Sequence, residues 1–238
     1  MTWYVVCGIH INMERLLLVS AKQQVVDVLT KEIVSGNLKP CQPLYERDLA
    51  ERLGVSRTPI REALQVLASA GFIETKSRVG WSVSIPDVKS IREILELRMI
   101  LETAGVETIL NGNNEPLRES VSTLFDPFTL DNIDRDIEQY LKIDDQFHKS
   151  LIEATDNKRM IDMYANLALW IDWVRHFISY ESSRSRSLRE HKEICEGLKN
   201  KDLKATQDRL KTHIKRVRNE FTLHLTSKGG ETAPTALK

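Results

Sequence analysis

Four side chains of the kind that bind metal ions interrupt apolar helical faces in the C-terminal part of the chain. Asp144 and His148 lie one helical turn apart on a face that also carries Leu141. His191 and His213 fall within the apolar stripes of two later segments. Unpaired polar groups are unfavourable in an apolar interior, so each of them needs a partner. If the three segments pack as helices of one bundle, the four side chains converge. One carboxylate with three imidazoles suits a divalent ion such as zinc, nickel or manganese.

Less specific interpretations of these residues stay open at this point. A single histidine on an apolar face is more often a hydrogen-bonded core residue than a metal ligand, and Asp144 with His148 can form an ordinary pair one turn apart. Arg98 also lies on an apolar face. It either pairs with Glu102 or holds the carboxylate of a ligand through two parallel donors. Arg98, Glu102 and Arg175 are therefore candidate effector-binding residues beside a candidate metal centre.

A second group of polar side chains follows a tight turn nearer the start of the chain. Ser56, Arg57, Thr58 and Arg61 open a helical segment just after Gly54, a residue that tolerates the left-handed backbone of such a turn. Arg57 and Arg61 share one helical face, and a guanidinium offers two parallel donors to a phosphate or to the edge of a guanine. The two hydroxyls can donate to a phosphate at the helix N-terminus. This pattern predicts a helix that reads the major groove of DNA.

Three further residues extend this candidate DNA-binding surface. Arg47 lies near the start of the preceding helix, and Lys76 and Arg78 lie at the turn of a following hairpin. For an isolated pair of arginines, charges on a solvated helix would be the better interpretation, and a helix-turn-helix can also mediate protein contacts. The surrounding turn and hairpin favour DNA binding.

The elements that must position these residues form a winged helix-turn-helix. Helices are expected at residues 21–36, at residues 46–53 and from Ser56 to about residue 70, with apolar residues at helical spacing. Residues 72–75 and 81–85 then alternate with period two on either side of a turn, which is typical of a hairpin. Helix, helix, tight turn, helix and hairpin is the order of the winged motif.

The rest of the chain is expected to be helical. Apolar residues recur at three- and four-residue spacing from Asp87 onward, and Pro86 marks a boundary because proline disfavours helix in the residue before it. The predicted fold class is therefore mostly α, with an all-helical bundle after the winged domain. The expected parts are an N-terminal extension or overlong start, a DNA-binding domain, a helical ligand-binding and dimerisation domain and a flexible tail, at residues 1–20, 21–86, 87–226 and 227–238.

Composition limits the class of protein. The 238 residues are 41% hydrophobic and 29% charged, which is typical of a globular chain with a substantial core. Thirty-four basic residues balance 34 acidic ones, so a DNA-binding surface must be a local patch. Three widely separated cysteines favour neither a disulfide framework nor a cysteine zinc site, and they fit the reducing cytoplasm. No apolar run approaches membrane-spanning length.

The first region resembles a known family of regulators. The segments Ile33–Pro40 and Leu49–Leu64 are similar to the signature of the GntR family of transcriptional regulators. The resemblance covers residues 21–86, and Cys41 departs from it because the family usually has glycine there. It implies a winged helix-turn-helix in which certain residues match positions that usually touch DNA. These residues are Arg47, Arg57, Thr58, Arg61 and Gly80.

The second region resembles the FCD domain, a ligand-binding domain of such regulators. The resemblance spans residues 90–222 and rests on Asp144–His148, Asn157, His191 and His213, with Arg98–Glu102 similar to the opening helix. In metal-binding members of that family, the positions that match the aspartate and the three histidines hold the ion. The member that binds acyl-CoA lacks this set, so the resemblance does not transfer that ligand here.

Together these observations predict a homodimeric, non-enzymatic transcriptional regulator. Its partners are a double-stranded DNA operator and a small carboxylate effector that binds at the divalent ion and changes DNA binding. Two alternatives remain: a purely structural metal with no small effector, or a metal-dependent hydrolase. The hydrolase leaves the DNA-binding half unexplained, and no general base or nucleophile is evident outside the ligand set.

Overall fold

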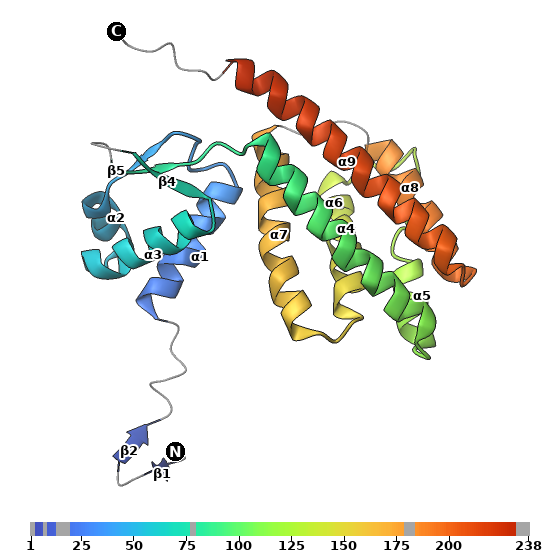
Figure 1. The fold of residues 1–238 in the computed structure, drawn as a ribbon, viewed down its shortest axis with the longest axis horizontal. Helices are drawn as coiled ribbons and strands as arrows, with labels where there is room; N and C mark the ends of the chain where they lie inside the picture. The colour runs from blue at the N-terminus through green and yellow to red at the C-terminus, as the bar shows by residue number, and fades with distance from the viewer. Residues whose placement is uncertain (1–2, 7–8, 13–19, 77–79, 179–183, 232–238) are drawn as a thin grey trace. The chain divides into compact units, whose positions relative to one another are not determined.

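A computed structural model describes residues 3–6, 9–12, 20–76, 80–178 and 184–231 of the chain (Figure 1). The chain divides into two compact units, Met1–Ile85 and Pro86–Lys238. Most of the described residues are helical, which confirms the predicted fold class. No described helix is both long enough and apolar enough to cross a membrane.

The described part of the N-terminal unit contains three helices and a small antiparallel sheet. The helices are α1 (Ala21–Val34), α2 (Glu46–Leu53) and α3 (Arg57–Ser69). The sheet has the order β3-β5-β4, and its strands are Pro43–Leu44, Gly80–Val83 and Ile73–Lys76 respectively. A separate antiparallel pair, β1 (Trp3–Val6) with β2 (Ile9–Asn12), lies in the expected extension.

A buried interface between α1 and α3 holds this unit together. Leu29 and Ile33 of α1 and Ile60 and Leu64 of α3 have no exposed surface. These residues are spaced at three or four positions, so each helix presents one apolar face to the other. Burial of one such side chain contributes about 1.5–3 kcal/mol. The core therefore fixes α3 with its opposite face toward solvent.

Two turns of this unit require left-handed backbone. Gly54 ends α2 at φ 66°, as the sequence predicts for the turn between the two helices. Cys41 adopts φ 63°, and its backbone N–H donates to the carbonyl of Val83 at 2.9 Å. The tight turn is therefore retained although cysteine replaces the expected glycine. A residue with a Cβ is strained in this conformation.

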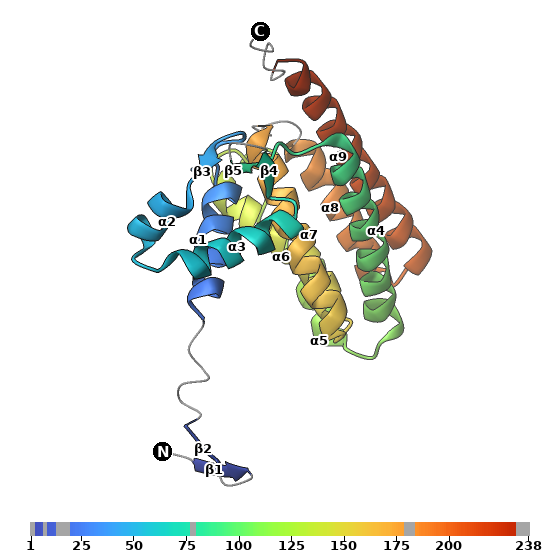
Figure 2. The ribbon, with the colours of Figure 1, turned by 60° about the vertical axis from the view of Figure 1, so that its left-hand side comes forward.

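The C-terminal unit is a bundle with six helices among its described residues. In chain order these are α4 (Val88–Asn111), α5 (Glu115–Ser122), α6 (Ile137–Glu153), α7 (Lys158–Phe177), α8 (Arg184–Lys199) and α9 (Leu203–Glu231). Helix α9 packs against both α4 and α8, and α4 also packs against α6 and α7 (Figures 1 and 2). Helix α4 thus packs against two of the three helices that carry candidate metal ligands, α6 and α9.

Two segments of the bundle differ from the sequence expectation. Residues 123–136 form turns rather than helix, and Pro127 within them has no backbone donor to continue a helical ladder. Phe125 and Ile133 are nevertheless buried, so their apolar spacing reflects packing of an irregular segment. Helix α9 continues to Glu231, into the segment expected to be a tail. The first proline after the start of α9 is Pro234, so no proline interrupts the helix before Glu231. Residues 232–238 lie outside the described residues.

Gly105 sets the closest approach of α4 to α6. A Cβ added at Gly105 would lie 2.0 Å from the backbone oxygen of Leu151, so the two helices must separate to admit it. In an exposed helix interior, a change from glycine to alanine stabilises by about 0.5–1 kcal/mol. We expect Gly105→Ala to have the opposite sign and to destabilise the C-terminal unit by about 1–3 kcal/mol.

The measurement is urea unfolding of the full chain, with circular dichroism as the signal that monitors unfolding. Glu107→Ala on the same helix is the control, because Glu107 is exposed. A midpoint for Gly105→Ala at or above that of the unmodified protein would contradict the close approach of the two helices.

Candidate functional site

The exposed beginning of α3 carries the predicted DNA-contacting residues. Ser56, Arg57 and Thr58 are exposed at this end, and Arg61 is exposed one turn later. Ser56 occupies the capping position, but its side chain makes no capping hydrogen bond. Arg57 makes no hydrogen bond with any described residue. Three donors are therefore available at a helix N-terminus, where anions are favoured.

Arg61 differs from Arg57 because its donors are already occupied. Its Nε and terminal nitrogen donate to the two carboxylate oxygens of Glu46 on α2 at 3.0 and 2.8 Å. Trp81 on β5 also donates to Glu46, at 3.3 Å. The hydrogen bond from Arg61 holds the pKa of Glu46 below its usual value, although burial opposes this. A DNA contact by Arg61 requires it to leave or share this carboxylate.

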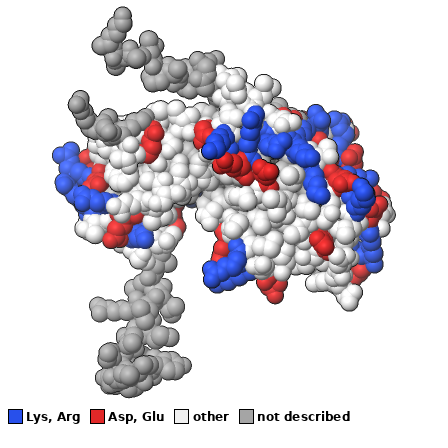
Figure 3. All heavy atoms as spheres, in the orientation of Figure 1, with Lys and Arg blue, Asp and Glu red and all other residues white. Residues whose placement is uncertain are grey.

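The other predicted DNA-binding residues lie around this end of the unit. Arg47 is exposed and pairs with the neighbouring Asp48 at 3.2 Å. Lys76 ends β4 and pairs in the ladder with Gly80, which begins β5 at φ 86°. Arg78 lies outside the described residues. Figure 3 shows Lys and Arg side chains at the end of the unit formed by α2 and α3, with acidic side chains among them.

Three buried histidines converge inside the C-terminal unit. His148 on α6, His191 on α8 and His213 on α9 each offer a ring nitrogen, and these atoms lie within 4.8 Å of one another. The Nε2 atoms of His148 and His191 are 3.1 Å apart. Two nitrogens bound at about 2.0–2.1 Å to one tetrahedral zinc ion lie roughly 3.3–3.4 Å apart. The spacing of this histidine cluster therefore fits a shared divalent ion.

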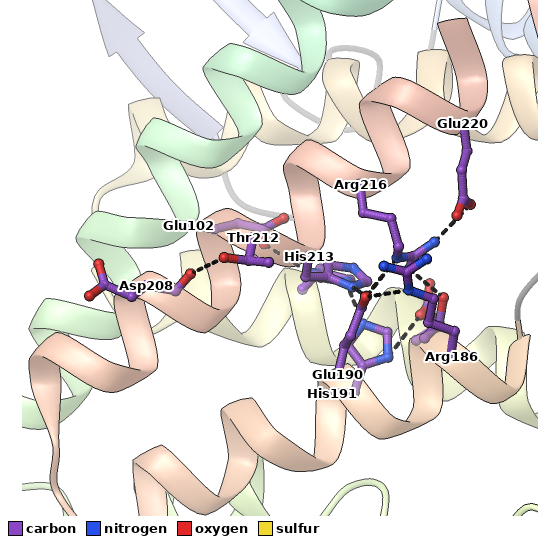
Figure 4. Close-up of polar contacts among 12 residues, drawn as sticks. Glu102, Arg186, Glu190, His191, Asp208, Thr212, His213, Arg216 and Glu220 are labelled. Atoms are coloured by element: carbon purple, nitrogen blue, oxygen red, sulfur yellow. Dashed lines mark hydrogen bonds and ion pairs between the residues drawn. The ribbon is translucent and has the colours of Figure 1, made fainter. Parts of the chain in front are cut away.

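Carboxylates orient two of the three imidazole rings. His148 Nδ1 lies 2.7 Å from Glu102 Oε2. His213 Nδ1 lies 2.8 Å from Glu190 Oε2, as Figure 4 shows. An ionised carboxylate only accepts hydrogen bonds, so each Nδ1 donates to its carboxylate, and Nε2 is the ring atom left to face the cluster. Carboxylate–histidine pairs of this kind orient metal ligands and raise their basicity.

The third ring, that of His191, is held by aromatic contacts and by a long polar contact to a tyrosine hydroxyl. His191 stacks on Phe125, with ring centroids 4.5 Å apart and an interplanar angle of 9°. Its Nδ1 lies 3.4 Å from the hydroxyl of Tyr140. Burial, followed by the charge of His213, lowers the pKa of His191 well below its usual value. Burial and the neighbouring His148 act in the same direction on the pKa of His213. Both rings are thus held in the neutral form that binds metal.

Asp144, the predicted fourth ligand, lies beside this cluster. Its Oδ1 is 3.5 Å from His191 Nδ1, and its Oδ2 is 3.5 Å from a terminal nitrogen of Arg175. Burial disfavours its charge, but positively charged neighbours outweigh burial and lower the pKa of Asp144. These neighbours are His191 and His148 when they are protonated, Arg175 and Arg98. The structure thus brings the three histidines together and places an ionised carboxylate next to them.

Arg98 and Glu102 form a buried pair on α4. Arg98 Nε donates to Glu102 Oε1 at 2.6 Å, and the hydroxyl of Tyr164 donates to the same oxygen at 3.1 Å. Burial would raise the pKa of Glu102, but Arg98 and His148 outweigh it and lower the pKa to about 2. Glu102 has no exposed surface and both of its oxygens are engaged. It is therefore placed to orient His148 rather than to touch an effector.

The remaining donors of Arg98 make no hydrogen bond to a described residue. Nε makes its one hydrogen bond to a described residue, and no buried side-chain nitrogen of the described residues is without a partner. Its terminal amino groups therefore keep some exposed surface, and Arg98 lines both of the cavities described next. Arg175 borders both cavities too, but it already contacts Asp144, Asp145 and Asp172 at 3.3–3.5 Å.

The two cavities meet at Arg98, His148 and Arg175. The first, here called the metal-side cavity, has a volume of about 320 Å³ and is also lined by Asp144 and His213. The second, here called the α6–α7 groove, has a volume of about 270 Å³ and lies between those two helices. The metal-side cavity gives a small molecule access to the histidine cluster and to the free donors of Arg98 together.

Sequence reasoning missed several residues that support the cluster. Glu190 accepts from Arg216 Nε at 2.8 Å while it holds His213, and Tyr140 and Tyr164 contact His191 and Glu102. Glu190 directly precedes His191 in the chain, but nothing in the sequence shows that it faces α9 rather than solvent. Its partner is set by how α8 packs on α9.

Comparisons with known proteins match both units. Residues 21–83 match the family model described as bacterial regulatory proteins, gntR family, and residues 93–216 match the FCD domain. The HTH-type transcriptional regulator YdhC of Bacillus subtilis (strain 168) is 27% identical over 193 residues, which cover 80% of this chain and 86% of that protein. The HTH-type transcriptional repressor RspR of Escherichia coli (strain K12) is 25% identical over 196 residues, covering 82% and 86%.

A solved structure has the same fold. The transcriptional regulator GntR from Rhodococcus sp. RHA1 matches 85% of this chain and 98% of its own at a TM-score of 0.69, with 22% sequence identity. The matched families and these relatives are transcriptional regulators rather than enzymes.

The carboxylate of Glu190 provides a test of the histidine cluster. Glu190→Gln replaces an acceptor with an amide that can also donate, so His213 loses the partner that fixes its proton on Nδ1. We expect zinc affinity to fall by about 10- to 100-fold. Competition with a chromophoric chelator measures this affinity, and circular dichroism checks the fold.

Glu193→Gln is the matched control, on the same helix but exposed. Equal zinc affinity in the two variants, or no zinc binding by the unmodified protein, would argue against a metal centre at these histidines.

Proposed function

The chain belongs to the gntR family of bacterial regulatory proteins and carries an FCD domain, so it is a DNA-binding transcriptional regulator. From this premise we propose that its C-terminal unit binds a divalent ion and the carboxylate of a small organic acid, and that this acid changes DNA binding. The observation that carries the proposal is the cavity that joins His148, His213 and the free donors of Arg98.

The donor set supports a resident divalent ion. His148, His191 and His213 would hold it, and Asp144, whose Oδ1 lies 3.5 Å from His191 Nδ1, would have to turn toward the cluster to become a fourth ligand. A bound ion would supply a Lewis-acidic position for an oxygen ligand. Imidazole with carboxylate suits zinc, nickel or manganese, and the donor types alone do not distinguish among these metals.

Arg98 supports the second part of the proposal, the acidic effector. A guanidinium binds a carboxylate through two parallel hydrogen bonds, and such charge-assisted bonds are about twice as strong as neutral ones. The terminal donors of Arg98 border the metal-side cavity, while Arg175 is already opposed by three carboxylates. Arg98 is thus a buried cation whose terminal donors make no hydrogen bond to a described residue. A purely structural ion would not need this open cavity beside it.

The DNA-binding half acts as one of two copies in this proposal. One recognition helix reads only a few base pairs, so useful affinity requires two half-sites and a homodimer joined through the C-terminal units. Leu97 and Ile100 on α4 and Leu223 on α9 are large apolar side chains at 44%, 59% and 69% exposure, which favours a covered face on these packed helices. The effector regulates by binding one dimer geometry better than the other, in the cytoplasm where the operator lies.

Arg57 tests the DNA-binding surface without disturbing the fold, because it has no hydrogen-bonded partner among the described residues. Arg57→Ala should weaken binding to the specific operator by about 1–3 kcal/mol, through loss of base contacts. We expect Arg61→Ala to have an effect of the same size. Lys76→Ala should weaken binding to all DNA sequences alike and reduce the salt dependence of the DNA affinity.

The measurement is fluorescence anisotropy at fixed salt, with an operator selected from genomic fragments of the source organism. Arg52→Ala is the control, since Arg52 pairs with Glu32 of α1. If both arginine variants at α3 match this control, α3 is not the recognition helix.

Metal removal separates an effector-site ion from a structural one. We expect the protein stripped with a chelator to stay folded and to bind DNA, but to lose its response to small organic acids; loss of a structural ion would unfold the unit instead. Anisotropy and thermal unfolding follow both properties, with acetate, succinate and citrate as probes.

His213→Ala should act like metal removal. His224→Ala on the same helix is the matched control, about three turns away and outside the cluster. A stripped protein that still responds to the acids would refute the role of the metal in effector binding, and one that unfolds would identify the ion as structural.

A further inference from the structure

The α6–α7 groove has a chemistry that neither the metal nor the DNA-binding surface uses. Its walls are mostly aliphatic, and its inner end is formed by Arg98 and His148. Ile152 and Ile171 are buried at 0% and 3% exposure, while Lys149 and Glu153 are exposed beside the groove. The groove is thus a slot with aliphatic walls, with Lys149 and Glu153 at its exposed edge and with Arg98 at its inner end. Its aliphatic walls are formed by Ile152, Ile161, Ala165, Ala168 and Ile171.

The polar groups at the inner part of the groove already have partners, except for those of Arg98. Tyr164 donates to Glu102, and Arg175 is matched by Asp145 and Asp172. The terminal donors of Arg98 remain, and they border the groove and the metal-side cavity alike. A ligand anchored at Arg98 therefore has an apolar slot whose lining includes its anchor.

We propose that the effector is a monocarboxylate with an apolar tail, whose carboxylate binds at Arg98 and whose hydrocarbon chain or ring lies in the α6–α7 groove. This inference rests on the proposed function and adds the chemical class of the effector. A cavity of about 150 Å³ holds benzene, so the 270 Å³ of the groove accommodates a tail of about six carbons or one ring.

The walls of the groove discriminate against two other classes of acid. A sugar acid would place hydroxyl groups against aliphatic walls, where they lose hydrogen bonds to water without replacement. A dicarboxylate would place its second charge near Asp145 and Asp172. Arg175 already contacts both of them, and Lys149, which also lines the groove, pairs with Glu153. The groove thus favours a tail without polar groups.

A chain-length series of acids tests the inference on the full chain loaded with zinc. Titration calorimetry compares acetate, butanoate, hexanoate and hexanedioate. Each methylene buried in an apolar site raises affinity by about fourfold, so hexanoate should bind roughly tenfold or more tighter than butanoate. Hexanedioate, of equal length, should bind more weakly than hexanoate.

A groove-filling variant locates the tail. Ala168 on α7 lines the groove, whereas Ala205 on α9 does not, and both are half-buried. Ala168→Leu should remove most of the gain from butanoate to hexanoate and leave zinc content and acetate affinity unchanged. Ala205→Leu, the same substitution away from the groove, should keep the full gain. If Ala168→Leu does not fold, Ala165→Leu fills the same groove from an exposed position.

Distinct results separate this inference from the function on which it rests. Acetate binding with no gain along the series overturns the apolar tail but leaves a metal-linked carboxylate site. Equal loss of hexanoate binding in Ala168→Leu and Ala205→Leu also overturns the groove as its location. If none of the acids binds to the zinc-loaded protein, both the inference and the proposed effector fail.

Discussion

The buried carboxylate of Glu102 is the constraint on which the C-terminal unit depends. It lies on α4 and accepts hydrogen bonds from Arg98 on the same helix, from His148 on α6 and from Tyr164 on α7. A buried charge that loses one partner typically destabilises a protein by about 3–5 kcal/mol. Three helices must therefore keep one relative position, and the rotation of the His148 ring follows from it.

A second carboxylate repeats this arrangement on the other side of the histidine cluster. Glu190 on α8 holds His213 on α9 and is itself held by Arg216 (Figure 4). The two networks approach the cluster from different helices, and each directs a free ring nitrogen toward its centre. Arg98 has donors left over, and it borders both cavities. Metal and effector would thus act on one connected set of hydrogen bonds.

The N-terminal unit resolves the apparent conflict between DNA binding and a chain of zero net charge. This unit needs a local basic patch rather than a net positive charge. Arg57 is exposed without a hydrogen-bonded partner among the described residues, whereas Arg61 is held by Glu46. The apolar interface of α1 with α3 keeps the polar face of α3 toward solvent. With α3 as the proposed recognition helix, affinity for DNA would depend on position at the helix N-terminus, where donors and helix dipole coincide.

The sequence by itself determined the winged helix-turn-helix, the helical C-terminal unit and the inward direction of His148, His191 and His213. Each of these follows from spacing along the chain, because the signals are local in sequence. They are the helical period of apolar residues, the glycines at turns and the free-energy cost of an unpaired polar group in an apolar interior. The role of Glu102 could not be predicted. Its position one turn from Arg98 indicated a pair, but its second oxygen binds a histidine 46 residues away. Only tertiary packing decided that contact, the approach of Glu190 to α9 and the groove between α6 and α7, since each depends on how separate helices are rotated against one another.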